Sequence, residues 1–333
     1  MHRYIILRGN GMKTILSVKK GVALAMVLSS MIMSSAHALT VYTAGPGSLA
    51  KSLASGFEQK TGVKVDIFQA TTGKVMARLE AEQANPQADI LISASWDTAE
   101  DLHNRGWLLP FSSANAAKVP ETLKSTDYIA QGVSALGIVW NSKSGTPEPK
   151  EWQDLTTADF KDKVTTPDPA LSGASLDLLI GLQNGMGEKA WQLFDALKQN
   201  GMVVSGPNAQ AVTPVMQGAK AAVFGAVDYV TYGNIAQGES LKVIFPASGT
   251  VIAPRPMMIL KTTQHADDAK AFVDYVLSPE GQKMVADAWL MPARTDVEAK
   301  RPLFTELKVL PTQSGGASER GEVLKRFNTL FAQ

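Results

Sequence analysis

Thr71, Thr72 and Gly73 form the stretch of this sequence whose residue types best suit the binding of a small molecule. The stretch follows an apolar segment with Val65 and Ile67 that is typical of a strand, and it precedes residues with helical periodicity. Thr72 is suited to cap that helix, and Gly73 lets the main chain come close to a ligand. The free amides and the dipole of a helix N-terminus attract an anion. These residues alone leave open an ordinary capped turn without a ligand.

A second loop repeats this pattern with Ser172, Gly173, Ala174 and Ser175. It lies between a strand expected at 164–167 and the helix that follows it. Its hydroxyl groups and main-chain amides again stand at a helix start, which suits a phosphate group without requiring a lysine. The two serines are equally explained as simple helix caps.

Other candidates follow strands expected elsewhere in the chain. Asp228 could accept hydrogen bonds from sugar hydroxyls, while Trp96 and Tyr229 could lie against the apolar face of a sugar. The alternatives are that Asp228 caps a helix, that Trp96 is a core residue, and that Arg255, between two prolines, is a surface hinge residue. The expected ligand-binding residues are Gly47, Ser48, Thr71, Thr72, Gly73, Ser93, Ser95, Trp96, Ser172, Gly173, Ala174, Ser175, Asp228, Tyr229 and Arg255.

Several kinds of chemistry are excluded by composition. The chain has no cysteine, so it has no disulfide, thiolate metal site or cysteine nucleophile. A secreted hydrolase is the competing class of function, but the sequence lacks a Gly-x-Ser-x-Gly elbow. His103 is expected on a helix surface and His265 just before a helix start, so neither is placed as a catalytic base. We therefore expect a protein that is not an enzyme, with no catalytic residue, metal ligand or cofactor.

The N-terminus has the pattern of a secretory signal peptide over residues 1–38. Residues 12–20 are basic, residues 21–33 are apolar but too few to span a bilayer comfortably, and Ala36-His37-Ala38 is a cleavage pattern. Residues 1–11 are expected to be an extension upstream of the true start at Met12. Cleavage after Ala38 removes five basic residues and no acid, which leaves 27 basic and 31 acidic side chains and a net charge of −4. This balance does not suggest a nucleic-acid partner.

The elements that would position these residues alternate between strand and helix. Strands at 39–44, 65–68 and 90–93 are separated by helices, which predicts an α/β domain with ligands at the carboxyl ends of its strands. The loops at 45–48, 71–73 and 93–97 should converge there. Further strands are expected at 134–141, 164–167, 221–227 and 241–246, and further helices at 176–184, 188–200, 209–217, 266–277 and 279–289. The tail from Gln313 to Arg320 is expected to be a loop.

Four blocks of sequence resemble those of solute-binding proteins of ATP-driven (ABC) transporters, of the ferric-iron-binding type. They are LTVYTAGPGSLAKSLASGFEQKTGVKV, NPQADILIS, ALGIVWN and AKAFVDYVLSPEGQKMVADAWLMPARTDV, and the resemblance covers nearly the whole mature chain. It implies an α/β, two-lobed type II periplasmic binding protein fold with a ligand cleft between the lobes. Two hinge strands would cross near 128–136 and 252–257. Lobe 1 would comprise 39–131 and 254–300, lobe 2 would comprise 132–253, and 301–333 would be a helical segment packing on the lobes.

The iron chemistry of that family does not transfer well to this chain. The iron binders have two adjacent tyrosines where this chain has Asp228, Tyr229 and Val230, and a histidine where it has Gly45-Pro46-Gly47. Fe³⁺ needs several anionic oxygen ligands, and the expected set is absent. The sequence is more similar to the hexose-phosphate-binding branch of the family.

The resemblance therefore implies a periplasmic component of an ABC importer in a Gram-negative bacterium. It would bind an anionic small molecule, a hexose phosphate such as glucose-6-phosphate, and deliver it to the permease in the inner membrane. Ferric iron with a synergistic anion, or a phosphonate, is the alternative ligand. A monomer is expected.

Overall fold

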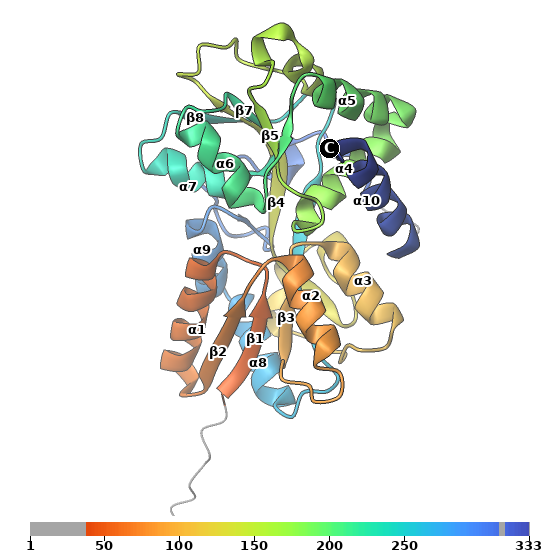
Figure 1. Ribbon diagram of the computed structural model, residues 1–333. Coiled ribbons are helices and arrows are strands. Elements are labelled where there is room, and N and C mark those ends of the chain that lie inside the picture. Colours follow the sequence, from red (N-terminus) through yellow and green to blue (C-terminus); the bar gives the residue numbers. More distant parts are fainter. Residues whose placement is uncertain (1–37, 313–316, 333) are drawn as a thin grey trace, which may run out of the picture. The chain divides into compact units, whose positions relative to one another are not determined.

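The computed structural model describes residues 38–312 and 317–332, so the predicted signal peptide lies outside the described residues apart from Ala38. Within this part of the chain the strands form one mixed sheet (Figure 1). They are β1 (Ala38–Thr43), β2 (Lys64–Gln69), β3 (Ile90–Ile92), β4 (Tyr128–Asn141), β5 (Val164–Thr166), β6 (Val203–Val204), β7 (Ala222–Val227), β8 (Leu241–Ile244), β9 (Ile252–Ile259) and β10 (Met291–Pro292).

The helices cover both parts of this sheet. They are α1 (Gly47–Thr61), α2 (Thr72–Ala81), α3 (Trp96–Asn104), α4 (Gly173–Met186), α5 (Glu188–Gln199), α6 (Asn208–Met216), α7 (Asp228–Ala236), α8 (Ala266–Val276), α9 (Pro279–Asp287) and α10 (Ala317–Phe331). Single 3-10 turns are η1 (Ala114–Lys118), η2 (Glu121–Leu123), η3 (Trp152–Thr156), η4 (Ala158–Phe160) and η5 (Phe304–Glu306).

The sheet order is β2-β1-β3-β9-β4-β7-β5-β6, with β8 and β10 also pairing with β4. Strands β1, β2 and β3 are parallel, as the alternation of strands and helices predicts. The carboxyl ends of parallel strands meet at one edge of a sheet, so the loops after these strands lie together. Strand β9 returns antiparallel beside β3 and β4.

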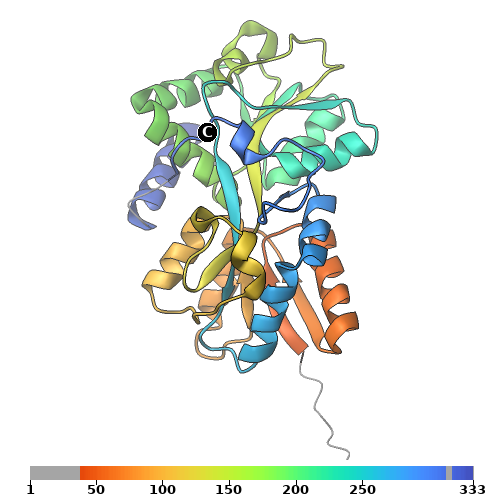
Figure 2. The same cartoon turned by 180° about the vertical axis from the view of Figure 1, so that it is seen from behind.

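The two largest hydrophobic clusters of the described residues flank the middle of the sheet. One contains Phe57 and Phe272, and the other contains Trp152, Phe194 and Phe224. We call the elements packed on the former the first lobe, together with α2 and α3 on a smaller cluster that contains Val75 and Leu102. Those packed on the latter are the second lobe, together with α6 on a smaller cluster that contains Val212. Strands β4 and β9 contribute to both cores and run from one lobe to the other (Figures 1 and 2). The predicted α/β architecture with two strands that cross between two lobes agrees with this arrangement, whereas the exact lobe boundaries stay a prediction.

Two local predictions were wrong. Residues 317–320, expected to be a loop, form the first turn of α10. Tertiary packing explains this, because Val323 and Phe327 of that helix are 3% and 2% exposed in the second core. The cap of α2 is Thr71, whose hydroxyl oxygen accepts a hydrogen bond from the amide of Lys74 at 3.4 Å, so Thr72 is the first helical residue instead.

No helix within residues 38–312 and 317–332 is long and apolar enough to cross a membrane.

Candidate functional site

A cavity of about 400 Å³ lies between the two lobes and has walls from both. This volume is in the usual range for small-molecule sites. The first lobe contributes the ends of β1 and β2 and the start of α2, and the second lobe contributes the starts of α4, α6 and α7. The predicted ligand-binding residues that line the cavity are Thr71, Thr72, Ser172, Ala174, Tyr229 and Arg255.

Among the helix N-termini at this cavity, those of α2 and α4 reach it from opposite lobes. Thr71 caps α2, and Ser172 caps α4 by accepting a hydrogen bond from the amide of Ser175 at 3.1 Å. The side-chain amide of Asn208 also donates to the Ser172 hydroxyl oxygen, at 2.6 Å. The serine is therefore both a helix cap and part of the cavity wall. Since a helix N-terminus carries partial positive charge, both ends favour an anion between them.

Arg255 supplies a full positive charge to the cavity wall. Its side chain is on β9 and the residue is 1% exposed, which excludes the alternative of a surface hinge residue. Nη2 donates to the carbonyl oxygen of Ala44 at 2.6 Å, and the guanidinium carbon lies 5.5 Å from the centre of the Tyr229 ring. Its Nε has no hydrogen-bond partner among the described residues. No ion pair to Arg255 is found in the described part of the chain.

The charge of the lining as a whole is positive. Lys74 and Arg255 line the cavity, and no aspartate or glutamate of residues 38–312 and 317–332 does. A buried cation without a carboxylate partner is costly, so a bound anion would compensate it. Among described residues there is also no cluster of three or more histidine, aspartate or glutamate side chains that could hold a metal ion.

Several lining residues were missed by sequence reasoning, among them Gly45, Gln69, Lys74 and Asn208. Gly45 belongs to the loop after β1 that was expected at the site, but the sequence pattern predicts Gly47 and Ser48 as the ligand-binding residues of that loop. A side chain at Gly45 would point at the cation, because its Cβ would lie 3.9 Å from Nη2 of Arg255. Gln69 and Asn208 carried no signal of their own in the sequence.

The remaining predicted residues do not line the cavity. They are Gly47, Ser48, Gly73, Ser93, Ser95, Trp96, Gly173, Ser175 and Asp228. Trp96 packs edge-on against Tyr128 with ring centroids 5.0 Å apart, which agrees with its alternative as a core residue.

Asp228 is sealed inside the protein at the first turn of α7. The residue is 0% exposed, its carboxylate forms an ion pair with Arg301, and the same oxygen accepts a hydrogen bond from the amide of Ala135 at 2.9 Å. Burial raises the pKa of the Asp228 carboxyl, although the arginine opposes this shift. In this arrangement the carboxylate is not presented to the cavity.

The loops beside the cavity bring the lobes into contact. A Cβ atom at Gly73 would lie 3.0 Å from the carbonyl oxygen of Ala170, and one at Gly173 would lie 3.0 Å from Cβ of Ser95. The Ser95 hydroxyl also donates to the carboxylate of Asp177 at 3.0 Å. Gly73, Gly173 and Ser95 therefore lie at the contact between the lobes and not in the cavity wall.

Comparison with known proteins agrees with this architecture. The family model for bacterial extracellular solute-binding proteins matches residues 85–310. The chain is 27% identical over 256 residues to a putative 2-aminoethylphosphonate-binding periplasmic protein of Salmonella typhimurium, covering 72% of this chain and 73% of the relative.

Two solved structures have the same fold. The periplasmic binding protein AfuA from Actinobacillus pleuropneumoniae, with fructose-6-phosphate bound, is 24% identical with a TM-score of 0.80, covering 88% of this chain and 98% of that one. A ferric binding protein from Campylobacter jejuni is 26% identical with a TM-score of 0.75, covering 88% and 99%.

Proposed function

This chain belongs to the family of bacterial extracellular solute-binding proteins, and we propose that its ligand is a small organic phosphate, with a hexose phosphate such as glucose-6-phosphate as the leading candidate. Members of this family bind solutes and are not enzymes. We further propose that the chain is exported to the periplasm through its signal peptide. There it would deliver the ligand to the permease of an ABC importer in the inner membrane.

The observation that carries this proposal is the buried guanidinium of Arg255 in a cavity that no carboxylate of the described part of the chain lines. The N-termini of α2 and α4 add partial positive charge on the two sides of the same cavity. A phosphate group could accept hydrogen bonds from main-chain amides and from the guanidinium together. The hydroxyl and amide side chains of Thr71, Gln69 and Asn208 are suited to sugar hydroxyls.

The alternative ligands fit this lining less well. Ferric iron requires several anionic oxygen ligands, and Tyr229 is the one side chain in the lining that could become anionic at an oxygen. An aminophosphonate carries an ammonium group, and a buried ammonium needs a carboxylate to compensate its charge. No described residue of the lining supplies one. A hexose phosphate has the anionic group without the cation, and a protein of the same fold is known with fructose-6-phosphate bound.

The test is calorimetric titration of the purified mature chain, residues 39–333, after bound ligand has been removed by unfolding and refolding. We expect saturable binding of glucose-6-phosphate, with much weaker binding of glucose and of inorganic phosphate alone. Equal binding of inorganic phosphate would reduce the proposal to a phosphate carrier. Binding of 2-aminoethylphosphonate or ferric citrate in preference to the sugar phosphates would contradict it.

A further inference from the structure

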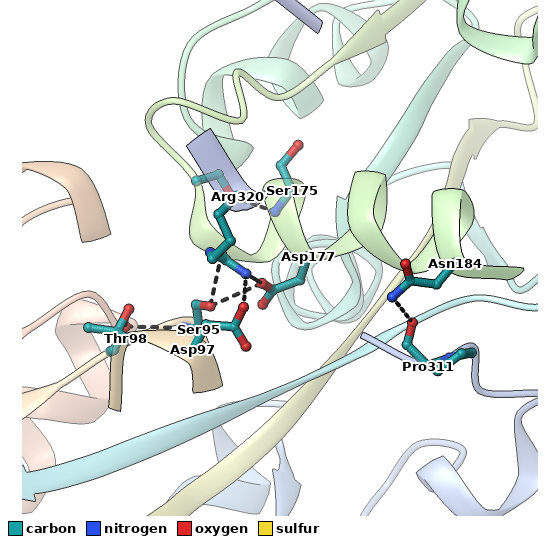
Figure 3. A network of polar contacts seen from close by, with 10 residues as sticks. Ser95, Asp97, Thr98, Ser175, Asp177, Asn184, Pro311 and Arg320 are labelled. Atoms are coloured by element: carbon teal, nitrogen blue, oxygen red, sulfur yellow. Dashed lines mark hydrogen bonds and ion pairs between the residues drawn. The ribbon is translucent and has the colours of Figure 1, made fainter. Parts of the chain in front are cut away.

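A second cluster of charges joins the two lobes away from the cavity lining (Figure 3). Arg320 of α10 forms ion pairs with Asp97 of α3 and with Asp177 of α4, the latter at 2.9 Å. Its Nη2 also donates to the hydroxyl oxygen of Ser95 at 3.2 Å, and that hydroxyl donates to Asp177. One guanidinium thus contacts groups from two separate segments, the start of α3 and α4.

The partners of Arg320 come from both lobes. Helix α10 packs on α4 and α5, and its Val323 and Phe327 are buried in the second core. Asp97 and Ser95 instead belong to the start of α3, and this helix packs on β9 in the first lobe. Arg320 is therefore carried by the second lobe and reaches across to the first.

The cluster is largely shielded from water. The side chains of Arg320, Asp97 and Asp177 are 14%, 12% and 6% exposed. Ion pairs that are shielded in this way are screened little by salt, and the loss of one partner leaves a charge without compensation. Opening the lobes would separate Arg320 from Asp97 while leaving it beside Asp177.

We propose that Arg320 is a latch that holds the two lobes closed over the cavity through Asp97 and Ser95, so that the C-terminal helix sets the balance between closed and open protein. This proposal does not depend on the identity of the ligand. The residues of the latch do not line the cavity; they are Arg320, Asp97, Asp177 and Ser95. It assigns a function to a helix that stands outside the predicted boundaries of both lobes.

The test measures the distance between the lobes directly. The chain has no cysteine. A variant with Asn104→Cys on α3 and Lys198→Cys on α5 therefore has two thiols, one at each substituted position. Both positions are exposed and belong to opposite lobes. Spin labels at these sites, read by pulsed electron resonance with and without glucose-6-phosphate, report the populations with short and long distances.

We expect Arg320→Ala to lower the ratio of short to long distances by about tenfold or more, since charge-assisted hydrogen bonds are lost. Arg320→Lys should have an intermediate effect, because an ammonium cannot bridge two carboxylates as a guanidinium does. Arg326→Ala is the matched control: Arg326 is also on α10, but its pair with Glu188, at 2.7 Å, is exposed and lies within the second lobe.

Two outcomes would overturn the latch: an unchanged distance distribution in Arg320→Ala, or a wild-type chain without short distances in either condition. If Arg320→Ala does not fold, Arg320→Lys and Asp97→Asn test the same contact from both sides. A shifted distribution in Arg320→Ala together with no binding of glucose-6-phosphate by the wild type would keep the latch and reject the proposed ligand.

Discussion

The guanidinium of Arg255 lies over the ring of Tyr229, 5.5 Å from its centre, and joins strand β9 to the start of α7 across the cavity. The ring face attracts the cation but does not neutralise it. The charge of Arg255 therefore remains available to an anion.

Replacing Arg255 by glutamine should weaken the binding of glucose-6-phosphate by about 2 kcal/mol, or roughly 30-fold. The reason is the loss of a charged hydrogen-bond donor, since glutamine keeps a polar side chain but no charge. Calorimetry gives the affinity, and thermal unfolding checks that the variant is folded. Unchanged affinity in a folded Arg255→Gln protein would place the phosphate elsewhere. Arg255→Lys, which keeps the charge, should lose less.

Replacing Gly45 by alanine should narrow the cavity beside the cation. The new methyl group would lie 3.1 Å from Oγ1 of Thr43 and 3.9 Å from Nη2 of Arg255. We expect affinity to fall by about tenfold through this crowding, with a small change in stability. Gly321→Ala adds a methyl group on α10 that meets nothing within 4 Å and should bind normally. Equal losses in both variants would argue against local crowding.

Removing Arg301 should destabilise the protein strongly. It leaves the fully buried carboxylate of Asp228 without its cation, at a cost of about 3 kcal/mol in the free energy of unfolding. Denaturant unfolding measures this loss. The double variant with Asp228→Asn and Arg301→Met should recover part of the stability, because no charge is then left buried. A double variant less stable than Arg301→Met alone would show that the carboxylate has other partners.

Acidification should favour the closed form of the ligand-free protein. Burial raises the pKa of Asp177 from its ordinary 3.8 to about 6, although Arg320 opposes the shift. If the pKa of Asp177 returns to its ordinary value when the lobes open, the closed form binds the proton more tightly. The population of the closed form therefore rises as the pH falls through about 6. The charge balance agrees, because Asp97 and Asp177 outnumber the single guanidinium of Arg320.

The distance measurement between the lobes tests this prediction as the pH falls from about 7.5 to about 5. Glu100 and Tyr128 interact electrostatically with the cluster, and Glu319 precedes Arg320 in the chain. Asp177→Asn removes the proposed group and leaves these in place, so its distance distribution should depend less on pH. An equal pH response in Asp177→Asn and wild type would assign the effect to the neighbours.

The sequence predicted the fold better than the site. Strand and helix periodicity is a local property, so the parallel strands β1 to β3 and the helices between them could be read directly. Helix starts at Thr71 and Ser172 could be predicted because caps have local signatures, although the cap of α2 was predicted one residue late, at Thr72. Asp228 was misplaced with respect to the cavity because its partner, Arg301, lies 73 residues away in the chain. Arg320 was missed for the same reason, since nothing local marks a residue that contacts Asp97 and Asp177.

The contacts at Gly73 and Gly173 have a consequence for selectivity. At both positions an added Cβ atom would come within 3.0 Å of the opposing lobe, so the loops meet with no room for a side chain. The distance between the lobes at these two loops is therefore nearly fixed in the closed protein. This fixed distance limits the size of the ligand over which the lobes can close. We expect that a longer phosphorylated molecule can reach Arg255 and still keep the two loops apart. Such a molecule would be retained by the protein yet presented poorly for transport, so affinity and uptake would rank ligands differently.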